Sequence, residues 1–313
     1  MKVFNKLEDV PADFGPTMIS VGNFDGVHCA HKRVIEAVVN RARQLRAKSL
    51  AVTFEPHPIR ILRPEAAPKL LTPLEAKLKL LETTGLDAVL VLPFSRDLSL
   101  TPPRDFAGEI LSRRLKAKEL HEGFNFHFGH RAEGNVERLA EFGREFGFEL
   151  RIYPELKLRG QPVSSSNIRQ LLSDGNVSTA RALLGYAFSI TATPGRGRGY
   201  GHKYTVPTIN LSRYDELVPG NGVYVTRTQV GDETFDSVTN VGIRPTFGDD
   251  SFAVESHLLN FHPIDVTAST RVEISFLKRL RPEIKWPNVE ALRAQIAKDV
   301  HRARRYFHLL GLS

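Results

Sequence analysis

Two groups of residues in this chain carry side chains that suit work on phosphate groups. The first is the run Gly22-Asn23-Phe24-Asp25-Gly26-Val27-His28-Cys29-Ala30-His31, which lies between a short β-branched run and a stretch with helical spacing. His28 and His31 are three residues apart, so they share one face of a first helical turn. Two imidazoles beside the free N–H groups of a helix N-terminus favour binding of a triphosphate. A capped helix with two ordinary surface histidines is the plainer interpretation.

The second group is a glycine-rich run followed by a strand-like segment. Gly195, Gly197, Gly199 and Gly201 stand at alternate positions, and Lys203 follows. Glycine lets backbone N–H groups close over phosphates, although neither a Walker loop nor a dinucleotide-binding fingerprint is present. A flexible hairpin loop is the alternative.

Thr208 and Asn210, just beyond this run, fall on one face of a strand by alternation. Their hydroxyl and amide oxygens suit Mg²⁺. A strand at a sheet edge that begins at Pro207 is the alternative.

Two further segments are weaker candidates by themselves. Ser164, Ser165 and Ser166 precede a short helical stretch that contains Arg169. Serines at a helix start cap N–H groups or leave them for an anion, and arginine offers a forked donor to phosphate oxygens. A plain N-cap with a solvated arginine is equally consistent. Glu255 lies in a strand-like run, where a carboxylate that faces solvent is the simplest interpretation.

Length and composition indicate a folded protein of two domains. The chain has 313 residues, of which 41% are apolar and 25% charged. No apolar run approaches the ~20 residues that cross a membrane, and the N-terminal residues do not resemble a secretory signal. The single cysteine, Cys29, cannot form an internal disulfide, so a cytoplasmic location is expected.

The net charge of +8 favours anionic partners. Both nucleic acid and phosphorylated small molecules fit such a charge. Apart from short clusters at 196–203 and 301–305, the basic residues are spread along the chain. Because a nucleic-acid groove concentrates its basic residues on one face, small-molecule phosphates are the favoured partners, with no nucleic acid and no membrane.

The first half of the chain alternates strand and helix patterns, which predicts an α/β domain with a parallel sheet covered on both faces. Strands are expected at 18–21, 49–54, 88–92, 119–124 and 148–153, and helices at 34–45, 74–81, 106–115, 136–146, 166–172 and 178–184. Ligands of such domains bind outside the carboxyl ends of the strands, where the run that begins at Gly22 is placed.

The second half has short strand-like runs separated by turn residues, which predicts a small antiparallel β-barrel. Strands are expected at 189–193, 222–229, 234–240, 253–259 and 272–280, and a closing helix follows Pro287. The expected class is therefore α/β plus β. The domain boundary is predicted near Gly185, with domains at 1–185 and 186–313.

The first domain resembles the bifunctional riboflavin kinase/FMN adenylyltransferase family, the bacterial FAD synthetases. The string from Gly22 to His31 resembles the H-x-G-H signature of nucleotidylyltransferases, a class with a Rossmann-like domain, with Ala30 in place of glycine. Residues 53–58 match a further motif of the family, and residues 123–129 and 164–169 resemble two others, with His127 in place of arginine and Ser166 in place of threonine. The resemblance implies that His28 and His31 act in catalysis. It implies ATP and FMN contacts at Gly22, Asn23, Phe24, Asp25, Asn125, Ser164, Ser165, Ser166 and Arg169.

The second domain is similar to the riboflavin kinase module of the same family. Residues 205–211 resemble its P-T-A-N motif, 240–247 match N-V-G-x-R-P-T-F, and 255–261 resemble E-x-H-L-L-D-F. The resemblance implies that Glu255 is the catalytic base and that Thr208 and Asn210 help to hold Mg²⁺ and ATP. It implies further ATP and flavin contacts at Gly195, Gly197, Gly201 and Lys203.

The function implied is phosphorylation of riboflavin to FMN, followed by adenylylation of FMN to FAD. Neither step needs a protein nucleophile, because positioning and charge stabilisation are sufficient. Three alternatives stay open: a kinase whose adenylyltransferase is weakened by Ala30 and His127, a basic RNA- or DNA-binding protein, and a nucleotidylyltransferase with another acceptor. The sequence does not determine the oligomeric state.

Overall fold

The computed structural model describes residues 1–195, 208–244 and 251–311, and it divides into two compact units, Met1–Ser165 and Ser166–Ser313. Each unit is described by itself. Gly197, Gly201 and Lys203, which the sequence predicts to bind phosphate, lie outside the described residues.

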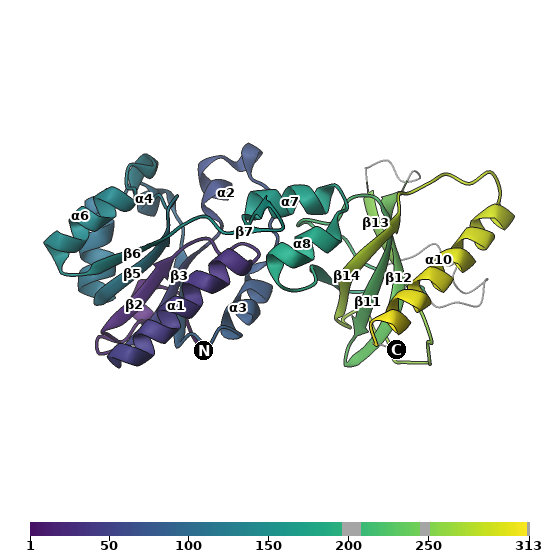
Figure 1. Ribbon diagram of the computed structural model, residues 1–313, viewed down its shortest axis with the longest axis horizontal. Helices are drawn as coiled ribbons and strands as arrows, with labels where there is room; N and C mark the ends of the chain where they lie inside the picture. The colour runs from purple at the N-terminus through teal and green to yellow at the C-terminus, as the bar shows by residue number, and fades with distance from the viewer. Residues whose placement is uncertain (196–207, 245–250, 312–313) are drawn as a thin grey trace. The chain divides into compact units, whose positions relative to one another are not determined.

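The first unit is built on a parallel sheet of six strands, as the apolar strand pattern predicts. Figure 1 shows this sheet with α1 (Cys29–Leu45) and α3 (Leu74–Glu82) on one side and α6 (Val136–Phe146) on the other. Its order is β1 (Lys2–Phe4), β4 (Ala88–Pro93), β3 (Lys48–Glu55), β2 (Thr17–Val21), β5 (Ala117–Gly123) and β6 (Glu149–Tyr153).

Alternation along the strands separates two apolar clusters. Ile19, Leu50 and Leu90 belong to the cluster that includes Leu139 of α6. Met18 and Ala51, which point to the opposite face, belong to the cluster that includes Ile35, Val38 and Val39 of α1 and Leu81 of α3. Two covered faces explain why the central strands are continuous apolar runs.

The order of the strands creates a switch point between β2 and β5. The chain runs from β2 through β3 to β4 on one side, and it then returns to add β5 and β6 on the other. Loops that leave the carboxyl ends of β2 and β5 therefore diverge, and such crevices bind ligands in open parallel sheets. Gly22 and Asn125 follow these two strands, so the fold places their loops at one edge of the sheet.

Most predicted helices are present, and several short elements were not anticipated. The segment expected as helix 106–115 is π-helical, η3 (Phe106–Arg114). The unanticipated elements are the edge strand β1, η1 (Leu7–Asp9), α2 (Pro58–Leu62), η2 (Pro64–Ala66), α4 (Arg96–Ser99), α5 (Pro103–Asp105), η4 (His130–Ala132), β7 (Lys157–Leu158) and β8 (Gln161–Pro162). Each is too short to show a period in the sequence.

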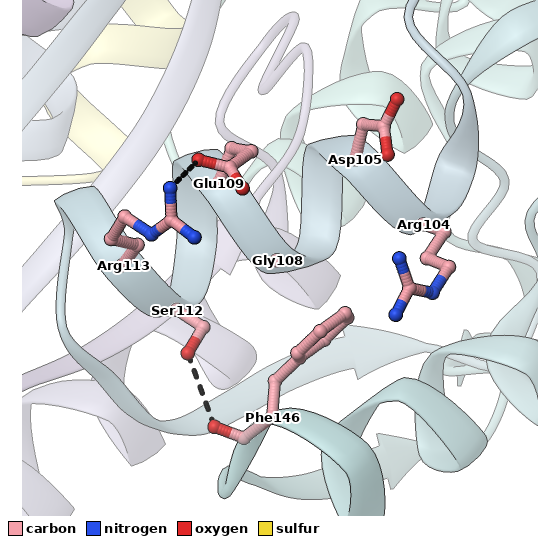
Figure 2. Close-up of a pocket in the computed structure, with 7 residues that line it drawn as sticks. All are labelled: Arg104, Asp105, Gly108, Glu109, Ser112, Arg113 and Phe146. Atoms are coloured by element: carbon pink, nitrogen blue, oxygen red, sulfur yellow. Dashed lines mark hydrogen bonds and ion pairs between the residues drawn. The ribbon is translucent and has the colours of Figure 1, made fainter.

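A shallow pocket lies against the π-helix, as Figure 2 shows. A Cβ at Gly108 would approach Cζ of Phe146 to 2.9 Å, so glycine allows this ring to pack there. Arg113 pairs with Glu109 at 2.6 Å, and Arg104 pairs with Glu145. Because both guanidinium groups are already paired with carboxylates, this pocket is a weak candidate for a phosphate-binding site.

A buried ionic cluster joins β5 to its neighbours. Glu119 is 3% exposed, and its carboxylate oxygens accept from Nε of Arg41 at 2.6 Å and from Nε of Arg151 at 2.7 Å. His121, on the same face of β5, has its Nδ1 2.8 Å from the Tyr153 hydroxyl. Burial lowers the pKa of His121 to about 4, although the Glu119 carboxylate opposes the shift.

This histidine predicts a dependence of stability on pH. Its pKa is about 4 in the folded protein and 6.5 in the unfolded chain, so its contribution is complete above pH 6.5 and is lost as pH falls towards 4. Between pH 7 and pH 5 we expect a loss of about 2 kcal/mol in the free energy of unfolding. His121→Gln should remove this part of the pH dependence in urea unfolding at the two pH values. The carboxyl groups are the same in both proteins and contribute equally to the pH dependence. An equal loss of stability in the wild type and in the variant would therefore contradict the role of His121.

The second unit contains the predicted antiparallel barrel and its closing helix. The strands pair in the order β10 (Thr208–Asn210), β13 (Ser251–Leu258), β12 (Glu233–Arg244), β11 (Gly222–Val230), β14 (Val272–Arg281) and β9 (Ser189–Ala192). The two edge strands are joined at one end, because Gly195 N donates to Asn210 O at 2.8 Å and Ser212 N donates to Thr193 O at 2.9 Å. The sheet is thus a curled, partly closed barrel.

One face of this sheet carries a closed ring of five buried hydroxyl groups. The oxygen–oxygen distances are 2.8 Å from Thr226 to Ser237, 2.8 Å from Ser237 to Thr228, 2.7 Å from Thr228 to Ser256, 3.0 Å from Ser256 to Thr239 and 2.6 Å from Thr239 to Thr226. All five residues are fully buried. Because each hydroxyl can both donate and accept, the ring satisfies buried polar groups that would otherwise be costly.

The helix α10 (Val289–Leu309) packs on the opposite face of the barrel. Ala303 and Phe307 join an apolar cluster with Val223, Val225 and Val238 of the strands. A buried ion pair between Arg281 Nε and Asp299 Oδ2, at 2.9 Å, ties the helix to β14. The four basic residues within 301–305 are all exposed, as a solvated helix face requires, and Ala303 between them is buried.

Helices α7 (Ser165–Ser173) and α8 (Val177–Leu184) belong, apart from Ser165, to the second compact unit. Gly220 N donates to Leu172 O at 2.9 Å, and Arg279 donates to Asp174 O at 3.1 Å. Leu183 and Leu184 are fully buried. The segment 166–185, which the sequence predicts to be part of the first domain, therefore packs on the barrel.

These contacts predict which fragment of the chain folds. A fragment of residues 166–313 should unfold at a higher temperature than one of residues 186–313, because the shorter one loses the buried faces of both helices. Burial of one leucine contributes about 1.5–3 kcal/mol, so the free energies of unfolding of the two fragments should differ by several kcal/mol. Circular dichroism melts of the two fragments measure it. Equal melting temperatures would show that α7 and α8 do not stabilise the barrel.

Candidate active sites

The first candidate site begins where β2 ends. Glu122 of β5 is buried, and its carboxyl group accepts from Val21 N at 2.7 Å, which continues the link between the two strands beyond their last paired residues. Burial raises the pKa of Glu122 well above its usual value. The loop then turns through three unusual backbone conformations, with φ of +46° at Phe24, +82° at Gly26 and +35° at Val27.

Asp25 and Phe24 have their side chains inside the protein. The Asp25 carboxylate is 2% exposed, and it accepts from Leu71 N at 3.0 Å and Thr72 N at 3.0 Å. Phe24 is buried against the His31 ring in an edge contact of 5.3 Å between ring centroids. Both were predicted to touch nucleotide. In this structure they hold the loop in shape, and direct contact stays a prediction.

The two histidines are brought together at the start of α1, as their spacing predicts. His28 is the N-cap, and its Nδ1 accepts from His31 N at 3.3 Å. The two rings stack with centroids 3.6 Å apart. Nδ1 of His31 is buried and has no hydrogen-bond partner within the described residues. Burial lowers the pKa of His31 well below its usual value, and the positive charges of His28 and Lys77 add to the shift.

Lys77 of α3 is a member of this site that the motifs did not reveal. It is 2% exposed, and its Nζ lies 3.5 Å from the Thr53 hydroxyl at the end of β3. The sequence contains one usable signal, since Lys77 stands four residues before Leu81 on the apolar face of α3. A charged residue at a core position was not recognised as unusual.

Of the other residues predicted for the first site, Asn125, Ser164 and Ser165 lie in the first compact unit. Asn125 follows β5 and is exposed, and its backbone oxygen is 2.9 Å from Nδ1 of His127. Ser165 Oγ donates to Asp25 O at 2.9 Å, which fixes the serine run to the Gly22 loop. Ser164 is half-buried. Ser166 and Arg169 belong to the second compact unit, so their role in the first site stays a prediction.

The second candidate site is a row of polar residues across three strands. Asn210 of β10 is paired with Glu255 of β13, and Glu255 is paired with Asn240 of β12. Directly paired residues point to the same face with Cβ atoms about 4.5–5.5 Å apart. Thr208 is paired with His257, two residues from Glu255, so it lies on this face as well. Thr208 is exposed and Glu255 is half-buried.

The electrostatics of this face leave the Glu255 carboxylate available. Within the described residues, the Glu255 side chain forms no hydrogen bond and no ion pair. Burial lowers the pKa of His257, and the charge of Arg304 on α10 contributes. The lowered pKa disfavours His257, two residues along β13, as a cationic partner of the carboxylate.

Gly195, predicted to contact phosphate, has a structural reason to be glycine. A Cβ there would lie 2.7 Å from Leu211 O, where the barrel edges meet. Its phosphate contact stays a prediction. Within the described ranges, no three His, Cys, Asp or Glu side chains are grouped as a metal site.

Comparison with known proteins identifies a family for each part of the chain. The FAD synthetase family model matches residues 10–167, and the riboflavin kinase family model matches residues 184–307. A bifunctional riboflavin kinase/FMN adenylyltransferase from Escherichia coli K12 is 31% identical over 293 residues, which cover 93% of either chain. The one from Listeria monocytogenes is 32% identical and covers 93% of this chain and 92% of the relative.

The chain belongs to the bifunctional riboflavin kinase/FMN adenylyltransferase family. It carries both modules in the family's order, and it is accordingly a riboflavin kinase and an FMN adenylyltransferase. The alternatives of a nucleic-acid-binding protein and of a nucleotidylyltransferase for another acceptor are thereby set aside.

The fold is also found in a solved structure. A protein described as a macrolide-efflux protein from Streptococcus pneumoniae superimposes with a TM-score of 0.87 at 24% identity, over 96% of this chain and 98% of that one. The likeness concerns the fold alone. Among the described residues, no helix is long and apolar enough to cross a membrane.

Proposed function

We propose that adenylyl transfer takes place at the carboxyl edge of the parallel sheet. A phosphate oxygen of FMN attacks the α-phosphorus of ATP. The bond from that phosphorus to the bridging oxygen breaks, and its electron pair leaves on pyrophosphate. The stacked pair of His28 and His31 at the start of α1 supports this assignment, because imidazole donors and the helix N-terminus can stabilise charge on the phosphates. We assign the orientation of the two substrates to Asn125, Ser164 and Ser165.

Phosphorylation of riboflavin is assigned to the row on the barrel. Glu255 accepts the proton of the ribityl 5′-hydroxyl while that oxygen attacks the γ-phosphorus, and ADP leaves. The pairing of Asn210 with Glu255 is the observation that supports this assignment, because the amide and the carboxylate that it requires are neighbours on one face of the sheet.

The residues of β10 fit a magnesium–ATP complex. Thr208 offers a hydroxyl oxygen and Asn210 an amide oxygen from the same face of the strand. Mg²⁺ prefers such hard oxygen ligands and takes the remainder from phosphates and water. When bound, the ion would neutralise charge on the ATP phosphates. Two neutral ligands hold a bare ion weakly, so we expect Mg²⁺ to bind together with ATP.

The decisive test is separation of the products. The full chain with riboflavin, ATP and Mg²⁺ should yield FMN first and then FAD, and with FMN and ATP it should yield FAD and pyrophosphate. Chromatography of the flavins distinguishes the outcomes. FMN without FAD would support the alternative in which Ala30 and His127 weaken adenylyl transfer. No flavin phosphate at all would refute the assignment.

A further inference from the structure

A buried lysine beside the adenylyl site has little to bind in the free protein. Lys77 is 2% exposed, yet lysine is among the residues that are almost never fully buried without a partner. Within the described residues, its ammonium group makes one hydrogen bond, at 3.5 Å to Thr53 Oγ1, and no ion pair within 4.0 Å. An ammonium has three donors, so two of them are unused there.

The surroundings of Lys77 are the loops that the nucleotide would contact. Thr53, its partner, also donates to Asn23 O at 3.3 Å, in the loop after β2. His31 belongs to the same site, and its Nδ1 is buried without a partner in the described part of the chain. The lysine and the histidine therefore converge on the carboxyl ends of β2 and β3 with unsatisfied polar atoms.

The nearby carboxylates do not neutralise this lysine by direct contact. Burial lowers the pKa of Lys77 below its usual value, and the charges of Asp25 and Glu55 oppose this shift only in part, so both carboxylates lie close enough to act through their charge. The Asp25 oxygens, however, accept from the backbone at Leu71 and Thr72. With no carboxylate in contact, the Lys77 amino group is available to an anionic ligand.

The site also needs a positive charge that His31 does not provide. The pKa of His31 is held well below its usual value by burial, so at neutral pH its imidazole is uncharged. In adenylyl transfer, negative charge grows on the departing pyrophosphate as its bond to the α-phosphorus breaks. A fixed cation at that point lowers the barrier most effectively in a water-poor site.

We propose that Lys77 binds the β- and γ-phosphates of ATP and stabilises them as they leave as pyrophosphate. The proposal rests on adenylyl transfer at this site. The lysine stem is flexible, and its single long hydrogen bond to Thr53 is easily exchanged for phosphate oxygens. No proton moves in this step: the electron pair of the broken P–O bond stays on pyrophosphate, and the ammonium offsets its charge.

The test compares Lys77→Met with Lys79→Met in the full chain. Lys79 lies on the same helix but is exposed and paired with Glu75, so it controls for loss of a lysine from α3. Lys77→Met should lower the kcat of FAD formation from FMN by about 10²–10³-fold. It should also weaken pyrophosphate binding, measured by titration calorimetry, at least tenfold. Lys79→Met should change neither quantity. FMN formation from riboflavin should be unchanged in both variants.

Pyrophosphate binding distinguishes this role from a structural one. If Lys77→Met binds pyrophosphate as tightly as the wild type, Lys77 only balances Asp25 and the proposal is wrong. If Lys77→Met fails to fold, the test uses NMR of the wild type. The ε-methylene signal of Lys77 is then assigned as the lysine signal that is missing from the spectrum of Lys77→Arg. Saturating pyrophosphate should shift this signal, and an unmoved signal would overturn the proposal. A wild type that makes no FAD from FMN would refute the proposed function itself, whatever Lys77 does.

Discussion

Glu255→Gln should lower the kcat of riboflavin phosphorylation by about 10²–10⁴-fold, which is the usual worth of general-base catalysis. Glutamine keeps the size of the side chain but cannot accept the proton from the ribityl hydroxyl. Because the substituted group acts mainly in the transition state, the KM for riboflavin should change little. The measurement is FMN production at saturating riboflavin and Mg²⁺–ATP.

Two controls separate the loss of a base from damage to the strand. FAD formation from supplied FMN should be unaffected, because it takes place at the other site. Thr208→Ala, on the neighbouring strand, should raise the Mg²⁺ and ATP concentrations needed for half-maximal FMN formation, and it should lower kcat less than Glu255→Gln does. A rate for Glu255→Gln close to that of the wild type would mean that Glu255 is only a strand carboxylate and that another group takes the proton.

Loss of either stacked histidine should produce the second large effect. We expect His28→Asn and His31→Gln each to lower the rate of FAD formation by about 10²–10³-fold, the typical cost of one donor to developing charge. Asparagine is a favoured N-cap, so His28→Asn retains the cap of α1 that His28 provides and removes only the imidazole. FMN formation by the same samples serves as the control for folding. If both variants made FAD at the wild-type rate, the phosphate-binding role of the pair would be refuted.

Residues placed by a short-range period were predictable from the sequence. Thr208 and Asn210 share a face because a strand alternates, and His28 and His31 stack because a helical turn brings them together. The parallel sheet followed from continuous apolar strands, and the barrel from short strands between turns. For such features, neighbours along the chain are enough.

Features that depend on a partner far along the chain could not be predicted. Asp25 belongs to a motif and was assigned to the nucleotide, yet its carboxylate holds the backbone at Leu71 and Thr72. Lys77 belongs to no motif, and only the packing of α3 over the sheet brings it to the site. The packing of α8 on the barrel could not be predicted either, because the apolar pattern of a helix does not show which unit its buried face contacts.

The ring of hydroxyl groups in the barrel constrains how this sequence can change over evolutionary time. Replacing Ser256 alone by alanine would leave Thr228 and Thr239 each without one hydrogen-bond partner. Each unsatisfied hydroxyl would lower the free energy of unfolding by about 1–3 kcal/mol. Replacing several members of the ring together by apolar residues of similar shape would avoid that cost. A lineage that changes one residue at a time, however, must first pass through a destabilised single variant. The five positions are therefore expected to be inherited as a block, with substitutions that are strongly non-additive.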